Sequence, residues 1–192
     1  MATVLTAKRN VKDKGYYSSF CLLADIIGNM EKIAYFAGGC FWCITPVFKI
    51  YGASKIVSGY SGGEEKDANY KDVKSQKTKH RETIAVYYDD NKVSYEKLLD
   101  IYLNNIDPYD EGGQYIDRGF SYTLAIFYND EEEKELALKK IKELEDSTSK
   151  KAYITLEAFK SFYEAEEYHQ DYYLKNPEEF EKELETSGRK ER

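Results

Sequence analysis

The sequence is poor in the residues that build metal centres and disulfide scaffolds. Its 192 residues include two histidines, His80 and His169, and three cysteines. One C-x-x-C pair with no second pair is not easily completed to a closed four-ligand zinc site. An odd number of cysteines in a chain of this length does not indicate a disulfide scaffold, and a reducing compartment is the simpler setting. We therefore expect no metal and a cytoplasmic protein.

Long apolar runs and an excess of positive charge are missing as well. No apolar stretch of the sequence is long enough to cross a membrane. The formal net charge of -7 argues against non-specific nucleic-acid binding. The chain is long enough for one domain with a full hydrophobic core. We expect neither a membrane nor a nucleic acid as a partner.

The chain divides into three parts by composition. Residues 1–29 begin with a polar, basic stretch, and the apolar run CLLADIIG that follows is too short and too late for the core of a signal peptide. We interpret residues 1–29 as a loosely attached N-terminal extension; an extra helix packed on the domain surface is the alternative. We expect residues 30–178 to form the main domain and residues 179–192 to form an acidic, solvated C-terminal tail.

Strand and helix patterns mingle along the main domain without a regular βα alternation. Alternating apolar residues predict strands, of which residues 81–89 indicate a half-buried one. Residues 130–146 indicate a surface helix with Leu138 facing inward. The other expected strands lie at 32–37, 55–60, 121–128 and 152–159, and the other expected helices at 40–52, 95–103 and 163–176.

This mixture favours an α+β fold, with a mixed or antiparallel sheet and helices packed on it. We expect a two-layer α/β sandwich with a ferredoxin-like core. Residues 61–80 and 104–120 are long polar loops rich in glycine and aspartate. Loops of that length in a compact domain are usually functional, so we expect them to form part of an active site.

The stretch YFAGGCFWCITPVF, residues 35–48, carries two of the cysteines around the only tryptophan. Cys40 follows a glycine pair at the start of a predicted helix, where unpaired backbone N–H groups should lower its pKa and favour a nucleophilic thiolate. Cys43 comes one turn later on the same face, and Phe41 with Trp42 supplies an apolar wall. The alternative is a pair of core cysteines beside core aromatic residues.

The motif Gly39-Cys40-Phe41-Trp42 resembles the signature of the peptide methionine sulfoxide reductase A family. Further segments resemble that family in the same order, over most of the chain from about Lys32 to Pro177. They are GYSGGEEKDANYKDVKS, TKHRETIAVYYD, SYEKLLDIYLNNIDP, GGQYIDRGFSYTLAIFY and FYEAEEYHQDYYLKN. Ordered and spaced matches are far more specific than a single motif.

The resemblance implies a role for each matching residue. Cys40 would be the nucleophile, and Glu82 would be the acid that protonates the sulfoxide oxygen. The other residues would surround the substrate: Phe41 and Trp42 at its S-methyl group, Tyr70 and Tyr122 at its oxygen, and Asp117 beside the site.

The implied function is reduction of the S-epimer of methionine sulfoxide, in proteins and free, through a Cys40 sulfenic acid, which repairs oxidative damage. No metal or organic cofactor is needed. The implied partners are oxidised proteins and a thiol reductant such as thioredoxin, and we expect a monomer. Two alternatives stay open: a C-x-x-C thiol-disulfide oxidoreductase, and a sulfoxide-binding module without turnover.

Some positions depart from the family pattern. The C-terminal cysteines with which many members resolve the oxidised enzyme are missing, and Lys74 stands where many have cysteine. Ile106 replaces the histidine before Asp-Pro, and Thr45 replaces a common glutamate. Cys43, Cys21 or an external thiol could resolve a Cys40 sulfenic acid; we predict Cys43, because one helical turn separates the two residues.

Overall fold

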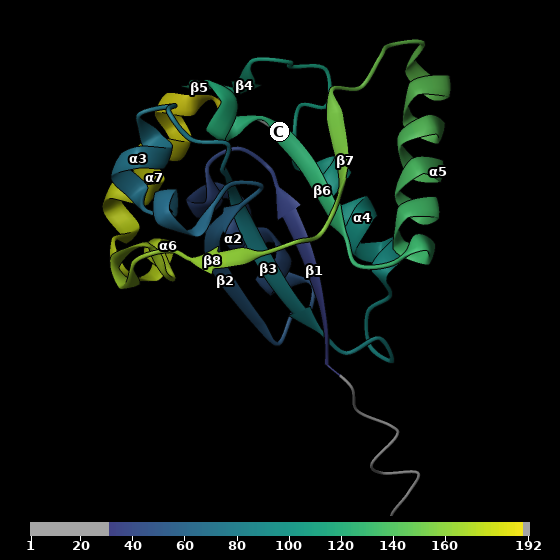
Figure 1. The fold of residues 1–192 in the computed structure, drawn as a ribbon, viewed down its shortest axis with the longest axis horizontal. Helices are drawn as coiled ribbons and strands as arrows, with labels where there is room; N and C mark the ends of the chain where they lie inside the picture. The colour runs from purple at the N-terminus through teal and green to yellow at the C-terminus, as the bar shows by residue number, and fades with distance from the viewer. Residues whose placement is uncertain (1–30, 190–192) are drawn as a thin grey trace, which may run out of the picture. The chain divides into compact units, whose positions relative to one another are not determined.

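The computed structural model describes residues 31–189, so the predicted N-terminal extension and Cys21 lie outside the described residues. Its main element is a six-stranded sheet in the order β7-β6-β1-β3-β2-β8 (Figure 1). Only β6 and β7 pair in parallel among these strands, and the other neighbours are antiparallel. The strands are β1 Lys32–Ala37, β2 Lys55–Ser61, β3 Arg81–Tyr88, β6 Leu124–Tyr128, β7 Ile154–Ala158 and β8 Phe162–Glu164.

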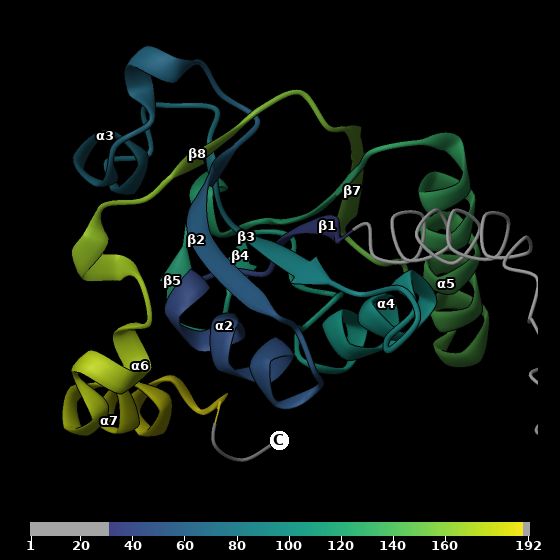
Figure 2. The same cartoon turned by 90° about the horizontal axis from the view of Figure 1, so that it is seen from below.

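Helices cover one face of this sheet. Figure 2 shows α2 and α4 side by side beneath the strands, with α5 next to α4. The main helices are α2 Phe41–Ile50, α4 Tyr95–Asn104, α5 Glu131–Thr148 and α7 Pro177–Ser187, and the short ones are α3 Tyr70–Lys74 and α6 Tyr172–Lys175. A small hairpin pairs β4 Gly113–Gln114 with β5 Asp117–Arg118. The predicted α+β class is therefore confirmed.

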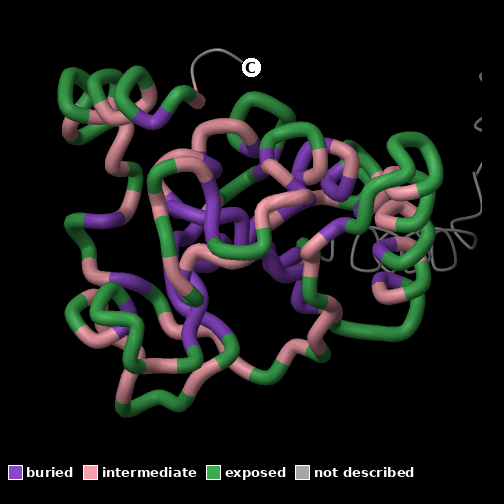
Figure 3. Tube along the Cα trace, turned by 90° about the horizontal axis from the view of Figure 1, so that it is seen from above, coloured by how far each residue is buried: buried purple, intermediate pink, exposed green. Residues whose placement is uncertain are grey.

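The largest core cluster lies between the sheet and helices α2 and α4. Phe36 of β1 stacks against Phe48 of α2 and Tyr102 of α4, with ring centroids 5.4 and 5.0 Å apart. All three side chains are fully buried. Burying aromatic side chains of this size is a major contribution to stability. In Figure 3 the buried segments gather in the middle of the sheet, while the outer turns of α5 and α7 are exposed.

The second face of the sheet is covered by an irregular segment rather than by a helix. Phe159 and Phe162 pack there, and the Phe159 ring stacks on Tyr35 with centroids 3.9 Å apart. Strand β3 is consequently buried along nearly its whole length. The prediction of a half-buried strand at 81–89 was wrong, because this cover comes from a distant part of the chain.

Three other expectations need correction. The helix expected at 163–176 is mostly replaced by β8, a 3₁₀ turn and the short α6, because β8 pairs with the edge of β2. Leu138 is 50% exposed, whereas the preceding Ala137 is buried against the domain. The C-terminal residues include helix α7, and they are not simply solvated: Arg189 is nearly buried.

Gly39 shows why the chain needs a glycine just before Cys40. Its φ is +80°, which residues with a Cβ rarely adopt. A Cβ placed there would lie 2.6 Å from Cβ of Gln114, closer than two carbons can approach. The positive φ lets the chain leave β1 and begin α2 with Cys40 as the N-cap residue.

The buried hydroxyl of Tyr102 gives a test of how the end of β1 is held. It donates a hydrogen bond of 2.7 Å to the carbonyl oxygen of Ala37, just before the glycine pair. Tyr102→Phe should lower the free energy of unfolding by about 1–3 kcal/mol, because a buried carbonyl loses its partner. Tyr109→Phe is the control, since the Tyr109 hydroxyl bonds Thr148 in an exposed position. Urea denaturation curves compare the two, and equal effects would contradict the assignment.

Candidate active site

Glu82 enters the site because of the strand register. Side chains alternate along β3, so Glu82 shares a face with Ile84 and Val86, which pack against the helices. It lies opposite Tyr60 of β2. Its carboxylate oxygen Oε2 accepts a hydrogen bond of 3.1 Å from the backbone N–H of Phe41, in the first turn of α2. The side chain is only 2% exposed, so Glu82 is not a solvated edge residue.

The side chains of Gln76 and Glu166 position the polar loops. Gln76 donates from Nε2 to Ser121 Oγ at 2.7 Å and accepts from the Ser121 backbone N–H at 2.9 Å. These bonds join the loop of Tyr70 to the loop of Tyr122. Glu166 accepts from the Tyr70 backbone N–H at 3.0 Å, which fixes the start of α3. Both tyrosines are therefore brought to the same place from distant segments.

The convergence of these segments creates a cavity of about 160 Å³ in front of Cys40. All seven residues for which the resemblance implied a catalytic or substrate-binding role line it, although their roles stay predictions. Lys74 and Glu183 also line it, and neither was among the predicted site residues. The seven predicted residues are Cys40, Phe41, Trp42, Tyr70, Glu82, Asp117 and Tyr122.

The aromatic wall is held rigidly from behind. The Trp42 ring stacks on Tyr172 with centroids 3.8 Å apart, and its Nε1–H donates to Nδ1 of His169 at 3.1 Å. His169 is buried, and burial lowers its pKa to about 4. Because the imidazole is neutral near pH 7, its Nδ1 is free to accept this hydrogen bond. His169 is therefore a structural residue that fixes the Trp42 ring.

Burial sets the protonation state of Glu82. Removal from water raises the pKa of its carboxyl to about 8, and the negative charge of Asp117 adds to the effect. The hydrogen bond from Phe41 and the charge of Lys74 oppose this shift, but burial dominates. Near pH 7 most molecules therefore carry a protonated Glu82 that can donate a proton.

The two cysteines share their titration in a way that the sequence did not predict. We expected the start of α2 to lower the pKa of Cys40, but that pKa is raised well above its ordinary value. Cys40 donates its proton toward Cys43, is 5% exposed, and faces Glu82 and Asp117. The Phe41 N–H that could have stabilised a thiolate is used by Glu82.

Cys43 carries the lowered pKa of the pair. The hydrogen bond from Cys40 is the largest cause, and the positive charge of Arg189 is another. Burial and the charge of Glu183 act in the opposite direction. The first thiolate to form therefore belongs to Cys43 rather than to Cys40.

Arg189 is a further residue of this region that sequence reasoning missed. It follows α7, and its Nη2 lies 3.2 Å from Oδ2 of Asp117. The sequence carried no signal for it, because a basic residue near the end of an acidic tail is usually solvated. Burial raises the pKa of Asp117, and Arg189 opposes that shift.

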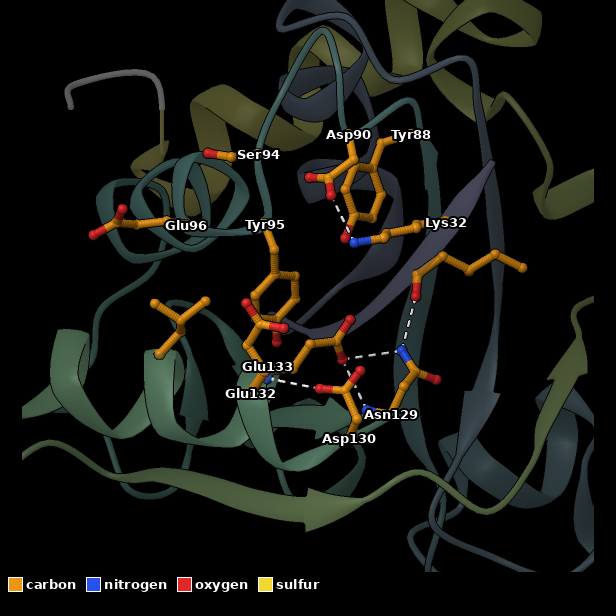
Figure 4. Close-up of a pocket in the computed structure, with 12 residues that line it drawn as sticks. Lys32, Tyr88, Asp90, Ser94, Tyr95, Glu96, Asn129, Asp130, Glu132 and Glu133 are labelled. Atoms are coloured by element: carbon orange, nitrogen blue, oxygen red, sulfur yellow. Dashed lines mark hydrogen bonds and ion pairs between the residues drawn. The ribbon is translucent and has the colours of Figure 1, made fainter. Parts of the chain in front are cut away.

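A larger cavity of about 360 Å³ lies away from the cysteines, where α4 and α5 begin. Figure 4 shows its acidic residues, of which Asp90 pairs with Lys32 while Asp130 and Glu133 bond the backbone at the start of α5. Asp130 accepts from the Glu133 backbone N–H at 2.9 Å, and Glu133 accepts from that of Asn129 at 2.8 Å. Such caps stabilise helices without any ligand. None of the predicted site residues lines this cavity.

Neither a metal site nor a membrane span is found in the part of the chain that the structure describes. Between residues 31 and 189, no three His, Cys, Asp or Glu side chains are grouped so that they could hold a metal ion. No described helix combines the length and the apolar character needed to cross a bilayer. The groups that line the catalytic cavity include the Cys40 thiol, a buried acid and phenol hydroxyl groups.

The order of thiol reactivity tests this electrostatic assignment. At about pH 7, iodoacetamide should alkylate Cys43 faster than Cys40, because the thiolate is the reacting form and Cys43 is also the more exposed of the two. Peptide mass spectrometry resolves the two sites over time. Faster labelling of Cys40 in the free enzyme would contradict the assignment.

Comparison with known proteins agrees with this geometry. A family described as "Peptide methionine sulfoxide reductase" matches residues 32–192. "Peptide methionine sulfoxide reductase MsrA" of Bacillus velezensis is 43% identical over 162 residues, which cover 83% of this chain and 92% of that protein. "Peptide methionine sulfoxide reductase MsrA 2" of Staphylococcus aureus is 45% identical over 163 residues, with the same two coverages.

A solved structure is similar as well. The reduced form of Mxr1 from Saccharomyces cerevisiae has a TM-score of 0.72 and 31% sequence identity, and the match covers 77% of this chain and 87% of that one. The resemblance that the sequence motifs suggested is thus confirmed at the level of both sequence and fold. The chain belongs to the peptide methionine sulfoxide reductase family.

Proposed function

We propose that this protein reduces the S-epimer of methionine sulfoxide to methionine, in proteins and as the free amino acid. One observation carries the proposal: a buried carboxyl group with a raised pKa and a thiol line the same small cavity, beside rigid aromatic rings. A sulfoxide needs all three, because its oxygen must be protonated, its sulfur must be attacked and its S-methyl group is apolar. Family membership supports the same reaction.

The first step joins Cys40 to the sulfoxide. Glu82 gives its proton to the sulfoxide oxygen, which turns a poor leaving group into a hydroxyl group. The Cys40 sulfur attacks the substrate sulfur, and the proton lost from the thiol replaces the one that Glu82 gave. The hydroxyl group then passes to the Cys40 sulfur: the S–O bond of the substrate and the new S–S bond break as the S–O bond to Cys40 forms. The products are methionine and a Cys40 sulfenic acid, so one oxygen atom moves from substrate to enzyme. Tyr70 and Tyr122 donate hydrogen bonds to the oxygen as charge develops on it.

The cavity also accounts for substrate selection. A volume of about 160 Å³ suits the end of one side chain rather than a folded segment. Phe41 and Trp42 form the apolar wall for the S-methyl group, and Asp117 lies beside it. With its oxygen directed toward Glu82 and its methyl group toward the rings, a sulfoxide of one hand presents its sulfur to Cys40, which makes the site stereoselective.

Cys43 resolves the sulfenic acid. Its thiolate is the first to form in the pair, and it lies one turn from Cys40, within the range that a disulfide spans. The attack forms a Cys40–Cys43 disulfide. A dithiol protein such as thioredoxin then reduces that disulfide, and no metal or organic cofactor takes part. We place the enzyme in the cytoplasm, as a monomer that repairs oxidised proteins.

The positions that depart from the family pattern keep structural partners. The Thr45 hydroxyl donates to the Phe41 carbonyl oxygen at 2.7 Å, and Ile106 is buried in the core beside Gly38. These contacts favour an intact site over a binding module without turnover. A simple C-x-x-C disulfide oxidoreductase would have no use for the buried Glu82, so this second alternative is not favoured either.

Glu82→Gln tests the role of the acid. The variant should bind sulfoxide but form methionine on the order of 10²-fold more slowly, because an amide cannot supply the proton. The measurement is methionine formed in a single turnover, without reductant. Glu157→Gln is the matched control, since Glu157 pairs with Arg81 next to Glu82 but on the other face of β3. Near-normal rates for Glu82→Gln would remove Glu82 from this role.

Cys43→Ser separates the two halves of the cycle. This variant should still form about one methionine per enzyme without reductant, since Cys40 is intact. It should lose most of the turnover driven by thioredoxin, because no disulfide can form, whereas Cys40→Ser should form no methionine at all. Normal thioredoxin-driven turnover by Cys43→Ser would show that the reductant meets the sulfenic acid directly.

A further inference from the structure

Arg189 reaches the cysteine pair from the end of the chain. Gly188 ends α7 in the left-handed conformation, and the next side chain turns inward, with 9% of it exposed. Its Nη2 contacts Oδ2 of Asp117 at 3.2 Å and the Gln114 carbonyl oxygen at 3.5 Å. The guanidinium lies 4.7 Å from the centroid of the Tyr115 ring. A buried cation held by so many contacts has a fixed position.

The same guanidinium lies beside Cys43. Arg189 and Cys43 together line a groove of about 330 Å³, bordered by α2 and α7, whereas Cys40 lines the catalytic cavity. Nη2 is also close to Gly39, where an added Cβ would lie 3.2 Å from it. Nη1 is buried without an aligned acceptor among the described residues, so the guanidinium retains a donor for an anion.

After the hydrogen bond from Cys40 and burial, Arg189 and Glu183 are the charged groups that act most on the Cys43 thiol. Arg189 favours the Cys43 thiolate through both its charge and a hydrogen bond, and it lowers the pKa of that thiol. Glu183 of α7 opposes it, as does removal from water. The catalytic cavity next to the pair is lined by the acidic Asp117 and Glu82 and by the basic Lys74. Cys40 is the thiol that donates toward Cys43. Without Arg189, the charge of Glu183 and burial would act on the Cys43 thiolate with no cation to oppose them among the main causes of its shifted pKa.

We propose that Arg189 is a positioning residue for the resolution step, in which it holds the Cys43 sulfur as a thiolate directed at Cys40. This inference rests on the proposed function, and it assigns Arg189 a place after methionine has formed. The Cys43 thiolate attacks the sulfur of the Cys40 sulfenic acid. An S–S bond forms, the S–O bond breaks, and the hydroxide takes a proton to leave as water. The Cys43 sulfur is oxidised and the Cys40 sulfur is reduced.

A purely structural role is the competing explanation. The ion pair with Asp117 could simply fasten the chain end to the domain. Such a role predicts a change in stability with no change in the reactivity of Cys43. Arg189→Lys retains the charge but not the planar fork, whereas Arg189→Met retains much of the length and removes the charge. Arg118→Met is the matched control, because Arg118 pairs with Asp110 in an exposed position.

The direct experiment measures Cys43 in full-length protein that also carries Cys40→Ser. The rate of Cys43 alkylation by iodoacetamide is followed against pH by peptide mass spectrometry. Arg189→Met should slow this reaction on the order of tenfold near pH 7 and move its midpoint to higher pH, because less thiolate is present. Arg189→Lys should restore most of the rate. An unchanged profile in Arg189→Met would overturn the inference, whatever the enzyme does with sulfoxide.

A single-turnover experiment with Cys40 intact places the effect in the cycle. Methionine formation and Cys40–Cys43 disulfide formation are followed together after one equivalent of sulfoxide is added. Arg189→Met should leave the rate of methionine formation within a few-fold and slow disulfide formation on the order of tenfold. The sulfenic acid should therefore persist long enough in this variant to be trapped by dimedone. Equal slowing of both steps would overturn the assignment to resolution. Failure of the unmodified enzyme to form methionine would instead overturn the proposed function. The alkylation profile would still test whether Arg189 stabilises the Cys43 thiolate.

Discussion

The hydrogen bond from the Phe41 backbone N–H to Glu82 is the contact on which the site depends. It joins the first turn of α2 to the central strand β3, across 41 residues of sequence. It fixes the carboxyl group beside Cys40 and takes up the helix N–H that a thiolate at Cys40 would otherwise use. The bond therefore positions the acid, while the hydrogen bond toward Cys43 and burial keep the Cys40 thiol protonated in the resting enzyme. Burial keeps Glu82 protonated despite this bond, so the proton needed by the sulfoxide is stored in place.

The remaining groups reach this pair through polar side chains that link distant segments. Gln76 joins the two active-site loops, and Glu166 fixes α3. Gln170 exchanges hydrogen bonds with the backbone of Ser58 in β2, which holds the C-terminal segment against the sheet and brings His169 behind Trp42. Each of these hydrogen bonds is partly buried and fixes the position of the segments that it joins. The loops are long, yet they present their tyrosines in fixed positions.

The sequence predicted well where local pattern and local chemistry decide the structure. The glycine pair, Cys40 and the start of α2 follow from turn and helix rules, and the α+β class follows from the mixture of patterns. It predicted poorly where distant segments decide. The hydrogen bond toward Cys43 is the largest cause of the raised pKa of Cys40, but the burial and the Glu82 charge that add to it come from distant segments. The burial of β3 likewise depends on Phe159 and its neighbours. Arg189 gave no signal at all, because only the packing of α7 shows that its charge lies beside Cys43.

The central claim is that Glu82 is a protonated acid in the free enzyme at neutral pH. An infrared titration from about pH 6 to about pH 10 follows the carboxylic acid C=O band of Glu82, which is assigned by its absence in Glu82→Gln. Since burial raises the pKa of this group to about 8, the band should be strong at neutral pH and fall with a midpoint near that value. A Glu82 that is already ionised at about pH 6 would contradict the account, because no stored proton would then be available for the sulfoxide oxygen.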